Sequence, residues 1–577
     1  MRYLAVALDY DGTIAEGGKV ADATLDALKR IQASGRRLLL VTGRQVKDLR
    51  RVFPEYEIFE LVVAENGAVL YRPKGKHKEV LAEPPSAAFL EALHSAGIEF
   101  DTGHVVISTA RENESALLQA ISELGLEMQV IFNKDVAMVL PSGVNKASGL
   151  TRALAELELS PHDVLAAGDA ENDHAFLALA ECSVAVGNAL PSLKERADLV
   201  TEGADGQGIA ELTDRLLDNE LADVAAPLQR NSSLLGYEGE REVTLPPRGV
   251  NLLVTGTSGS GKSTAVTGFL ERLAERGYQL CIIDPEGDYE GFEPAIVLGD
   301  TKRAPSADEV LEVLRSPDRH VVANLLGVSL GDRPRYFARL LPRLLELRAT
   351  RGRPHWIVVD EAHHLMPADW EIASEISPPA EGMVYVTVHP DLMYKGALEQ
   401  VNTMLVTGKQ PAEAVRAFAQ AVGETAKLEA PEELEHRHAL LWHRGQPGAI
   451  EFTVEEGKLD LKRHGRKYAE GNLGPDRSFY FRGPNGDLKL QAQNLMLFSQ
   501  IGEGVDDKTW TYHLRRHDYS QWFNDAIKDK KLAKAVRKIE DKKGIGPKKS
   551  RSLIRAAIEE RFTLPADEPS GLQDENS

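Results

Sequence analysis

The sequence predicts an α/β protein with two parallel-sheet domains, followed by a third domain that is mainly helical. Three observations predict this. The chain of 577 residues is too long for one hydrophobic core, strand-like and helical patterns alternate over most of it, and its character changes after about residue 461. Strands that alternate with helices form βαβ units and therefore a parallel sheet. A hydrophobic fraction of 42% and a charged fraction of 27% are typical of folded domains.

The first alternation covers residues 1–217. Its strand-like runs are short and apolar, as expected for strands buried on both faces of a sheet. The clearest runs are 38–41, 61–64, 164–167 and 183–186. Residues 218–242 are polar and predict a linker with an edge hairpin.

The second alternation covers residues 243–460, with central strands predicted at 252–254, 280–283, 356–359 and 384–386. Residues 461–565 are aromatic, basic and mostly helical in pattern, and form the predicted third domain. Residues 566–577 are strongly polar and are predicted to be a disordered tail.

Composition limits the cellular setting. The net charge of −20 argues against a protein coated for nucleic acid, although residues 528–555 are rich in lysine and arginine. Cys182 and Cys281 both lie in strand-like runs, so we expect reduced thiols and a cytoplasmic protein. No signal peptide is recognisable, and no apolar run approaches the length of a membrane span, so we expect no membrane partner.

The first candidate site follows the first apolar run. Asp9-Tyr10-Asp11-Gly12-Thr13 places two carboxylates two residues apart at the end of a strand. Asp9 is predicted to attack phosphorus as a nucleophile, while Asp11 protonates the leaving oxygen and later activates water. Thr42 can bind phosphate oxygens, and Lys146 can offset negative charge in the transition state. Together these four side chains predict phosphoryl transfer.

A metal ion belongs to the same prediction. Mg²⁺ would offset the repulsion between the carboxylate and the phosphate group. The run Gly168-Asp169-Ala170-Glu171-Asn172-Asp173 ends a third strand and supplies further oxygen ligands.

These four motifs, in this order, resemble the haloacid dehalogenase superfamily, and in detail its Cof-type, sugar-phosphatase-like branch. Three further runs resemble that branch: Glu65-Asn66-Gly67-Ala68, 185–189 and 205–210. The resemblance implies a Rossmann-type phosphatase with Asp9 as nucleophile and Asp11 as acid and base. It implies Asp9, Asp11 and Asp169 as ligands of Mg²⁺, supported by Asn172 or Asp173. It also implies a cap domain between the second and third motifs. Here the cap is small, at about residues 82–140, and its size leaves the substrate class open.

The second candidate site is a P-loop. Gly256-Thr257-Ser258-Gly259-Ser260-Gly261-Lys262-Ser263 stands between an apolar strand and a helical segment. The backbone amides of such a loop wrap phosphates, Lys262 reaches the β- and γ-phosphate oxygens, and Ser263 binds Mg²⁺. The sequence therefore predicts bound ATP. The predicted ATP-binding residues are Gly256, Thr257, Ser258, Gly259, Ser260, Gly261, Lys262, Ser263, Thr264, Asp360 and Arg444.

The partner of the P-loop is the run Trp356 to His364, an apolar strand that delivers Asp360 to Mg²⁺ and Glu361 to the attacking water. A second carboxylate at this position favours ATP hydrolysis over kinase chemistry. The run Asp284-Pro285-Glu286-Gly287-Asp288-Tyr289 resembles a signature of the HerA/FtsK-like ATPases, as does Asp-Glu-Ala-His. That resemblance implies a RecA-like sheet, ring assembly, often hexameric, and motor work on DNA or protein. Thr387 and His389 replace the glutamine usual in the sensor strand.

For Arg444 and for residues 543–550, the sequence leaves two interpretations open. Arg444 is either an arginine finger for a neighbouring subunit or a surface arginine in a turn. The run 543–550 resembles a helix–hairpin–helix turn that grips DNA phosphates, but Lys542 stands where an apolar residue is expected, so a solvated charged loop is the alternative. Trp510, His513, Leu514, Trp522 and Phe523 are predicted to be core.

The chain is thus predicted to be a hydrolase with two sites: a Mg²⁺-dependent phosphomonoesterase that forms an aspartyl-phosphate, and a HerA-like ATPase, with nucleic acid as the partner of the basic segment. We retain three alternatives: a metabolic sugar-phosphate phosphatase with a regulatory ATPase, a polynucleotide kinase-phosphatase, and a scaffold that uses ATP only to assemble. A homo-oligomeric ring is expected, with Mg²⁺ and ATP as cofactors and a phosphoester as substrate.

Overall fold

The fold is described from a computed structural model, which covers residues 2–133, 135–224, 229–257, 260–370, 381–459, 477–484, 486, 488–527 and 529–561. Ser258 and Gly259 of the P-loop and the predicted tail at 566–577 lie outside the described residues. So does part of the predicted linker, at 225–228. Contacts divide the chain into two compact units, of which one is residues 1–285, 293–323 and 327–459, and the other the remainder.

The phosphatase-like domain is built on a mostly parallel sheet. Among the described residues this sheet has eight strands, in the order β12-β11-β10-β1-β2-β3-β4-β5, and β4 and β5 join it antiparallel at one edge. Its strands are β1 (Ala5–Leu8), β2 (Arg37–Val41), β3 (Leu61–Ala64), β4 (Val69–Arg72), β5 (His77–Val80), β10 (Val164–Gly168), β11 (Cys182–Ala185) and β12 (Leu199–Val200). Its helices are α1 (Asp22–Ala33), α2 (Val46–Val52), α5 (Lys146–Leu157), α6 (His174–Leu179), α7 (Pro191–Lys194) and α8 (Asp205–Asn219).

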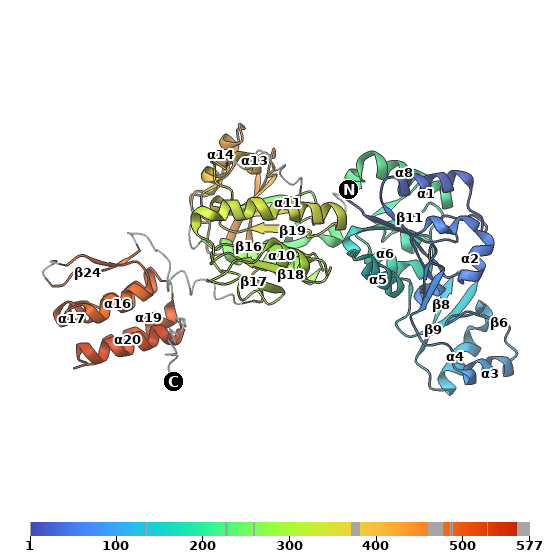
Figure 1. Ribbon diagram of the computed structural model, residues 1–577, viewed down its shortest axis with the longest axis horizontal. Coiled ribbons are helices and arrows are strands. Elements are labelled where there is room, and N and C mark those ends of the chain that lie inside the picture. The colour runs from blue at the N-terminus through green and yellow to red at the C-terminus, as the bar shows by residue number, and fades with distance from the viewer. Residues whose placement is uncertain are drawn as a thin grey trace, which may run out of the picture. The chain divides into compact units, whose positions relative to one another are not determined.

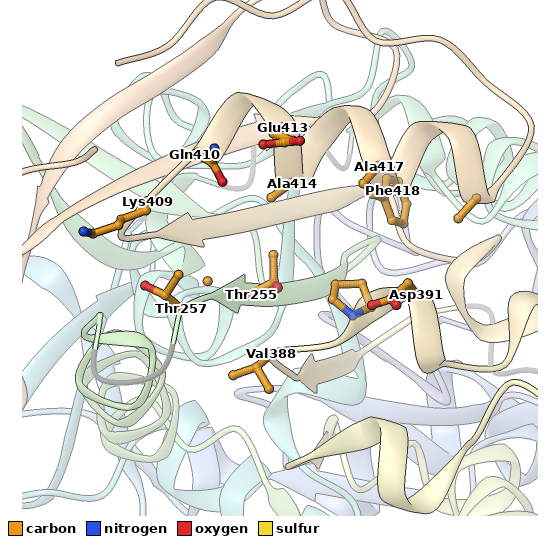
Figure 2. A pocket seen from close by; sticks show the side chains of 13 residues that line it. Thr255, Thr257, Val388, Asp391, Lys409, Gln410, Glu413, Ala414, Ala417 and Phe418 are labelled. Carbon is orange, nitrogen blue, oxygen red and sulfur yellow. The ribbon is translucent and has the colours of Figure 1, made fainter. Parts of the chain in front are cut away.

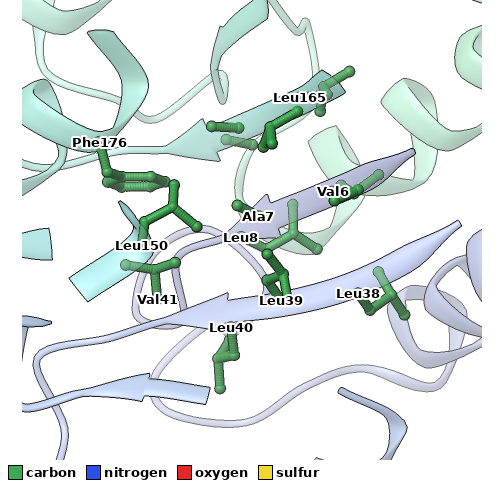
Figure 3. Close-up of a cluster of buried hydrophobic side chains, with 14 of the residues drawn as sticks. Val6, Ala7, Leu8, Leu38, Leu39, Leu40, Val41, Leu150, Leu165 and Phe176 are labelled. Atoms are coloured by element: carbon green, nitrogen blue, oxygen red, sulfur yellow. The ribbon is translucent and has the colours of Figure 1, made fainter. Parts of the chain in front are cut away.

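Central strands of this sheet are apolar on both faces because helices cover both. Figure 3 shows β1 and β2 side by side, with Val6 opposite Leu38 and Leu8 opposite Leu40, and with Leu150 of α5 and Phe176 of α6 near Val41. These side chains are buried. Their packing fixes the strand ends from which the candidate site residues emerge.

A small cap domain is inserted between β5 and α5. It contains a sheet whose described strands follow the order β6-β7-β9-β8, with two helices (Figure 1). Its elements are α3 (Ala87–Ser95), β6 (Phe100–Thr102), β7 (Ile107–Ala110), α4 (Glu114–Glu123), β8 (Met128–Asn133) and β9 (Val136–Pro141). A separate core that includes Phe89, Leu117 and Val139 stabilises it. The insertion therefore falls where the sequence predicts the cap.

The second sheet contains the predicted ATPase strands. Within the described ranges its order is β14-β13-β23-β22-β21-β15-β20-β19-β16-β18-β17. The P-loop strand β15 pairs in parallel with both β20 and β21, while β22, β23, β13 and β14 extend one edge antiparallel. The hairpin of β13 and β14 begins within residues 218–242, where the sequence predicts an edge hairpin, and ends at residue 245.

The bounds of this domain agree with the apolar runs in the sequence. Its strands are β13 (Ser233–Glu238), β14 (Arg241–Leu245), β15 (Asn251–Gly256), β16 (Leu280–Asp284), β17 (Ala295–Leu298), β18 (His320–Asn324), β19 (Trp356–Val359), β20 (Met383–Val386), β21 (Thr403–Thr407), β22 (His438–His443) and β23 (Ala449–Val454). Its helices are α9 (Lys262–Glu275), α10 (Ala307–Leu314), α11 (Arg333–Arg351), α12 (Ala362–Leu365), α13 (Lys395–Leu398) and α14 (Pro411–Ala421).

A buried polar network within the first unit joins residues that precede strands. His162, before β10, stacks on Tyr278, before β16, with ring centroids 3.8 Å apart. His162 Nδ1 lies 2.8 Å from a carboxylate oxygen of Glu181, and the Tyr278 hydroxyl donates to the same oxygen at 2.9 Å. Arg248, before β15, donates to the carbonyl oxygen of His162. Because the candidate site residues follow their strands, this network lies at the opposite strand ends from both sites.

The third domain is mainly helical, as predicted. Its elements are β24 (Phe479–Phe481), β25 (Leu490–Ala492), α16 (Leu495–Gly504), α17 (Asp507–Arg515), α18 (Asp518–Asp525), α19 (Lys530–Glu540) and α20 (Pro547–Arg561). Trp510, His513, Leu514, Trp522 and Phe523 are all buried, which confirms that they are core side chains.

The turn between α19 and α20 has both apolar and charged positions. Ile545 packs against the core of the third domain, whereas Lys548 and Lys549 are exposed in the first turn of α20. Over the described residues, none of the helices is long and apolar enough to span a bilayer.

The two cysteines provide a test of the strand packing. Cys182 and Cys281 are fully buried, and burial raises the pKa of each thiol to about 12. Thiolate is the reactive form, so we expect neither cysteine to react with Ellman's reagent at pH 8 in the native protein. Both should react in guanidinium chloride. Rapid release of a thiol equivalent before denaturation would contradict this packing.

Candidate active sites

Strand order brings the first group of predicted residues together. β1 pairs in parallel with β10 on one side and β2 on the other, so the residues after these strands share one sheet edge. Asp9 follows β1, Asp169 follows β10 and Thr42 follows β2. Lys146 reaches the same edge as the first residue of α5, whose N-cap, Asn145, accepts hydrogen bonds from two backbone amides.

Lys146 lies between two carboxylates. Its ammonium group contacts Asp9 Oδ1 and, at 2.5 Å, Asp173 Oδ1, and all three side chains are buried. Burial raises the pKa of Asp9 well above its ordinary value, and Lys146 only partly offsets this. Burial lowers the pKa of Lys146, but Asp173 and Asp9 outweigh it and raise that pKa. The arrangement holds a cation against the predicted nucleophile.

The same group offers oxygen ligands to a cation. Carboxylate oxygens of Asp9, Asp169 and Asp173 lie within 4.8 Å of one another. Asn172 Oδ1 is buried and has no hydrogen-bond partner in the described part of the chain. Oxygen donors of this kind suit Mg²⁺. Asp173 also accepts hydrogen bonds from the backbone amides of Asp169 and Ala170, and so stabilises the loop after β10.

Asp11 is not brought into that carboxylate group. Its carboxylate forms a bidentate pair with Arg44, at 2.6 Å from Nε and 2.7 Å from NH2. Arg44 also pairs with Asp48, and these hydrogen bonds raise the pKa of Arg44. The carboxylate of Asp11 therefore lies outside the group formed by Asp9, Asp169 and Asp173. This differs from the sequence prediction, which made Asp11 a metal ligand. Thr42 Oγ1 accepts from the Arg44 amide, so its hydroxyl proton points elsewhere.

Residues flagged only by resemblance hold the loop that contains Asp11. Asn188 Nδ2 donates to the carbonyl oxygen of Gly12 at 2.8 Å, and Asn188 Oδ1 accepts from the amide of Asp205. Thr13 Oγ1 lies 3.3 Å from Asp169 Oδ1. Sequence reasoning missed the roles of Arg44, Glu65 and Asn66. The signal was their position just after the ends of β2 and β3.

The P-loop begins where β15 ends. Gly256 has a φ of +145°, and a Cβ there would overlap with the carbonyl oxygen of Thr407 on β21, so glycine is required. Lys262 begins α9, and its ammonium group donates to the carbonyl oxygens of Gly256 and Thr257 at 2.8 and 3.0 Å. Ser263 is half-buried beside it. The lysine is thus directed into the loop that is predicted to hold phosphates.

The predicted catalytic acids of the second site follow β19. Asp360 is buried, and its backbone amide donates a hydrogen bond to the carbonyl oxygen of Ile283 near the end of β16. Glu361 has a φ of +42°, a left-handed conformation that costs a non-glycine residue free energy. His363 Nδ1 lies 3.6 Å from the Glu361 carboxylate and 2.9 Å from Thr387 Oγ1. The sensor position is therefore linked to Glu361 through a histidine that sequence reasoning did not select.

A cavity of about 290 Å³ adjoins the start of the P-loop. Figure 2 shows Glu413 and Phe418 of α14, and Gln410 just before this helix, on one side, with Thr255 and Val388 opposite. The remaining lining residues are Gly256, Thr257, Pro390, Asp391, Lys409, Ala414, Ala417 and Ala421. A mostly apolar cavity beside a phosphate-binding loop can hold a flat ring.

Arg444 is not brought to the P-loop. It follows β22, whose last residue pairs with Thr403 at the beginning of β21, whereas the P-loop lies beside the end of β21. Its guanidinium pairs with Glu424 and donates to the carbonyl oxygens of Glu399 and Val401. These contacts are those of a surface arginine in a turn, away from the P-loop of its own chain; a role as arginine finger for a neighbouring subunit stays a prediction.

Comparisons with known proteins match two parts of the chain to families. Residues 6–100 and 98–212 match the family model described as haloacid dehalogenase-like hydrolase. Residues 249–382 match the model described as AAA domain, which supports a nucleotide-binding ATPase-type fold.

The similar curated proteins match the first domain. A phosphoglycolate phosphatase of Methanothermobacter thermautotrophicus is 33% identical over 226 residues, which cover 37% of this chain and 98% of the relative. Phosphoglycolate phosphatase 2 of Saccharolobus solfataricus is 28% identical over 221 residues, or 37% of this chain and 92% of the relative. A crystal structure of a haloacid dehalogenase-like hydrolase from Bacteroides thetaiotaomicron is 21% identical, covers 37% and 99% of the two chains, and gives a TM-score of 0.33.

Removal of the buried cation tests the first site. Lys146→Met should lower phosphatase turnover about 10²- to 10³-fold and destabilise the first domain by about 3–5 kcal/mol, because it leaves two buried carboxylates uncompensated. Adding Asp173→Asn should restore part of the stability but not the turnover. Steady-state hydrolysis and hydrogen exchange of the β1 and β10 amides in increasing urea would measure the two effects.

Lys29→Met is the matched control, since Lys29 is exposed in the same domain. A double variant that is no more stable than Lys146→Met would show that the Lys146–Asp173 contact has no part in the energetics described above.

Proposed function

Its first domain makes this chain a member of the haloacid dehalogenase-like hydrolases, and we propose that this domain is a Mg²⁺-dependent phosphomonoesterase that works through an aspartyl-phosphate. The supporting observation is the buried contact of Lys146 with Asp9 and Asp173 at the sheet edge. A cation in that position compensates the nucleophile and the incoming phosphate at once.

The reaction divides into two displacements. Asp9 Oδ attacks phosphorus, an O–P bond forms, and the bond from phosphorus to the leaving oxygen breaks as Asp11 gives that oxygen its proton. Asp11, now ionised, takes a proton from water, whose oxygen attacks phosphorus. The bond from Asp9 to phosphorus then breaks, and inorganic phosphate leaves. Arg44 must release Asp11, at least in part, for these proton transfers.

Mg²⁺ would be held by Asp9 and Asp169, with Asp173 and Asn172 in support, and it would reduce the repulsion between carboxylate and phosphate. Thr42 would donate its hydroxyl proton to a phosphate oxygen. Carboxylate and amide oxygens suit Mg²⁺, and a hydroxyl group suits a phosphate oxygen.

We propose a small phosphomonoester with an anionic leaving group as substrate, and phosphoglycolate as the first candidate. Arg44 supports this choice, because its planar guanidinium lies beside the acid that serves the leaving oxygen and can form a bidentate pair with a carboxylate. The relatives that match this domain are named phosphoglycolate phosphatases.

For residues 243–460 we propose ATP hydrolysis. Lys262 and Ser263 would bind phosphates and Mg²⁺, Asp360 would support the metal, and Glu361 would orient the attacking water. The cavity between α14 and Thr255 would take the base. HerA/FtsK-like ring assembly and action on nucleic acid are the finer parts of this proposal; the exposed Lys548 and Lys549 at the start of α20 support the second.

Two alternatives make different demands. A metabolic phosphatase with a regulatory ATPase needs no nucleic acid, and its ATPase would respond to the phosphoester instead. A polynucleotide kinase-phosphatase must exclude water from ATP, which the carboxylate of Glu361 disfavours.

Separate variants should separate the two activities. Asp9→Asn should abolish phosphoglycolate hydrolysis and leave ATP hydrolysis within about twofold, because an amide in place of the carboxylate cannot form the aspartyl-phosphate. Lys262→Ala should do the reverse. Both rates are measured on the same purified protein with Mg²⁺ and after its removal by EDTA, and the exposed Asp26→Asn serves as control. Unchanged phosphatase turnover in Asp9→Asn would remove Asp9 as the nucleophile.

Nucleic acid should stimulate ATP hydrolysis if the basic segment binds it. Binding of this kind depends on phosphate contacts, so stimulation should fall steeply between 50 and 200 mM salt, about in proportion to the number of contacts. Lys548→Gln with Lys549→Gln should weaken stimulation, whereas the charge-matched Lys74→Gln with Lys76→Gln, on an exposed turn, should not. ATP hydrolysis indifferent to DNA and RNA would favour the metabolic alternative.

A further inference from the structure

Three consecutive residues after β3 have left-handed backbone. The φ angles are +52° at Glu65, +52° at Asn66 and +102° at Gly67. Such a conformation is unfavourable for a non-glycine residue and persists only where surrounding contacts hold it. All three residues are buried. The contacts that hold this turn lead to each part of the phosphatase site.

The backbone of the turn contacts the loop after β2, which contains Thr42, and helix α5, which begins at Lys146. The amides of Glu65 and Asn66 donate to the carbonyl oxygens of Arg44 and Thr42 at 3.1 and 3.0 Å. Gly67 lies so close to α5 that a Cβ would overlap with the carbonyl oxygen of Asn145, the residue before Lys146. The turn therefore sets the spacing between Thr42 and Lys146.

Asn66 contacts both the loop after β10, which carries predicted metal ligands, and the cap. Its Oδ1 accepts from Asn172 Nδ2 at 2.8 Å, and its Nδ2 donates to the sulfur of Met138, on cap strand β9, at 2.7 Å. A thioether is a weak acceptor, so shape rather than hydrogen-bond strength governs the second contact.

Glu65 binds the cap through three backbone amides. The amide of His104 donates to Oε1 at 3.0 Å, and those of Val105 and Val106 donate to Oε2 at 3.0 and 3.2 Å. These residues connect β6 to β7. Gly103 also lies against the carboxylate, where a Cβ would overlap with it. A buried carboxylate with three amide donors is a charge-assisted contact, stronger than three neutral hydrogen bonds.

We propose that Glu65 is a positioning residue that holds the cap closed over the Asp9 site. The Glu65–Gly67 turn contacts the loop after β2, the loop after β10 and the start of α5, which together carry the predicted site residues. The position of the cap therefore depends on the same turn that holds these residues together. Glu65 then determines how tightly the leaving group is enclosed, while the phosphoryl group is bound by residues below the turn. This inference rests on the proposed phosphatase function.

The carboxylate is specifically required. A glutamine at residue 65 would keep one acceptor oxygen but turn an NH₂ group toward amide donors, which repel it. The loss of one or more charge-assisted hydrogen bonds, each about 1.5–3 kcal/mol, corresponds to about a 10- to 100-fold shift in cap closure.

The test compares Glu65→Gln with Glu99→Gln, which changes an exposed carboxylate of the same cap. In Glu65→Gln the KM for phosphoglycolate should rise about 10- to 100-fold and kcat should change less. The inhibition constant of inorganic phosphate, which has no leaving group to enclose, should stay within about twofold. The amides of residues 104–106 should exchange with deuterium about 10- to 100-fold faster than in wild type. Glu99→Gln should match wild type in all four.

The other outcomes are also decisive. Unchanged KM and unchanged exchange at residues 104–106 would overturn the proposal. A parallel rise in the KM and in the phosphate inhibition constant would assign Glu65 a general structural role and overturn it too. If wild type hydrolyses no phosphoester, the proposed function fails instead, and the amide exchange alone decides whether Glu65 holds the cap.

Discussion

The contact of Lys146 with Asp9 and Asp173 is the constraint on which the first domain depends. Burial of three charged groups is costly in free energy unless each is compensated, and here one ammonium group serves two carboxylates. That compensation needs the N-terminus of α5 at the carboxyl ends of β1 and β10. The central strands, the start of α5 and the loop after β10 must therefore form together before the site can exist.

Both candidate sites use the same property of a parallel sheet. Residues that follow neighbouring strands meet at one edge, so short runs far apart in the chain converge without long loops. In the first domain this places Asp9, Thr42 and Asp169 together, and in the second the P-loop and Asp360 follow strands of one sheet. The polar network around Glu181 joins residues that precede strands, and so lies away from the residues that do chemistry.

Backbone strain occurs at a turn beside each of the two candidate sites. Glu361 and the pair Glu65–Asn66 have positive φ although they are not glycine. In both places the strained residue carries a carboxylate that is directed at a task, toward His363 in one case and toward the cap amides in the other. Packing around each turn offsets the strain, which is why the same residues would be unfavourable in an open loop.

The sequence by itself determined the α/β class, the order of the domains and the residues that end the central strands, because apolar periodicity and strand-end motifs are local properties. It named Asp9, Thr42, Lys146 and Lys262 from such motifs. Only the tertiary structure decided that Asp11 pairs with Arg44, that Arg444 is held by Glu424 away from the P-loop, and that Glu65 reaches the cap. Those outcomes depend on distances between residues far apart in the chain, and a local pattern carries no information about them.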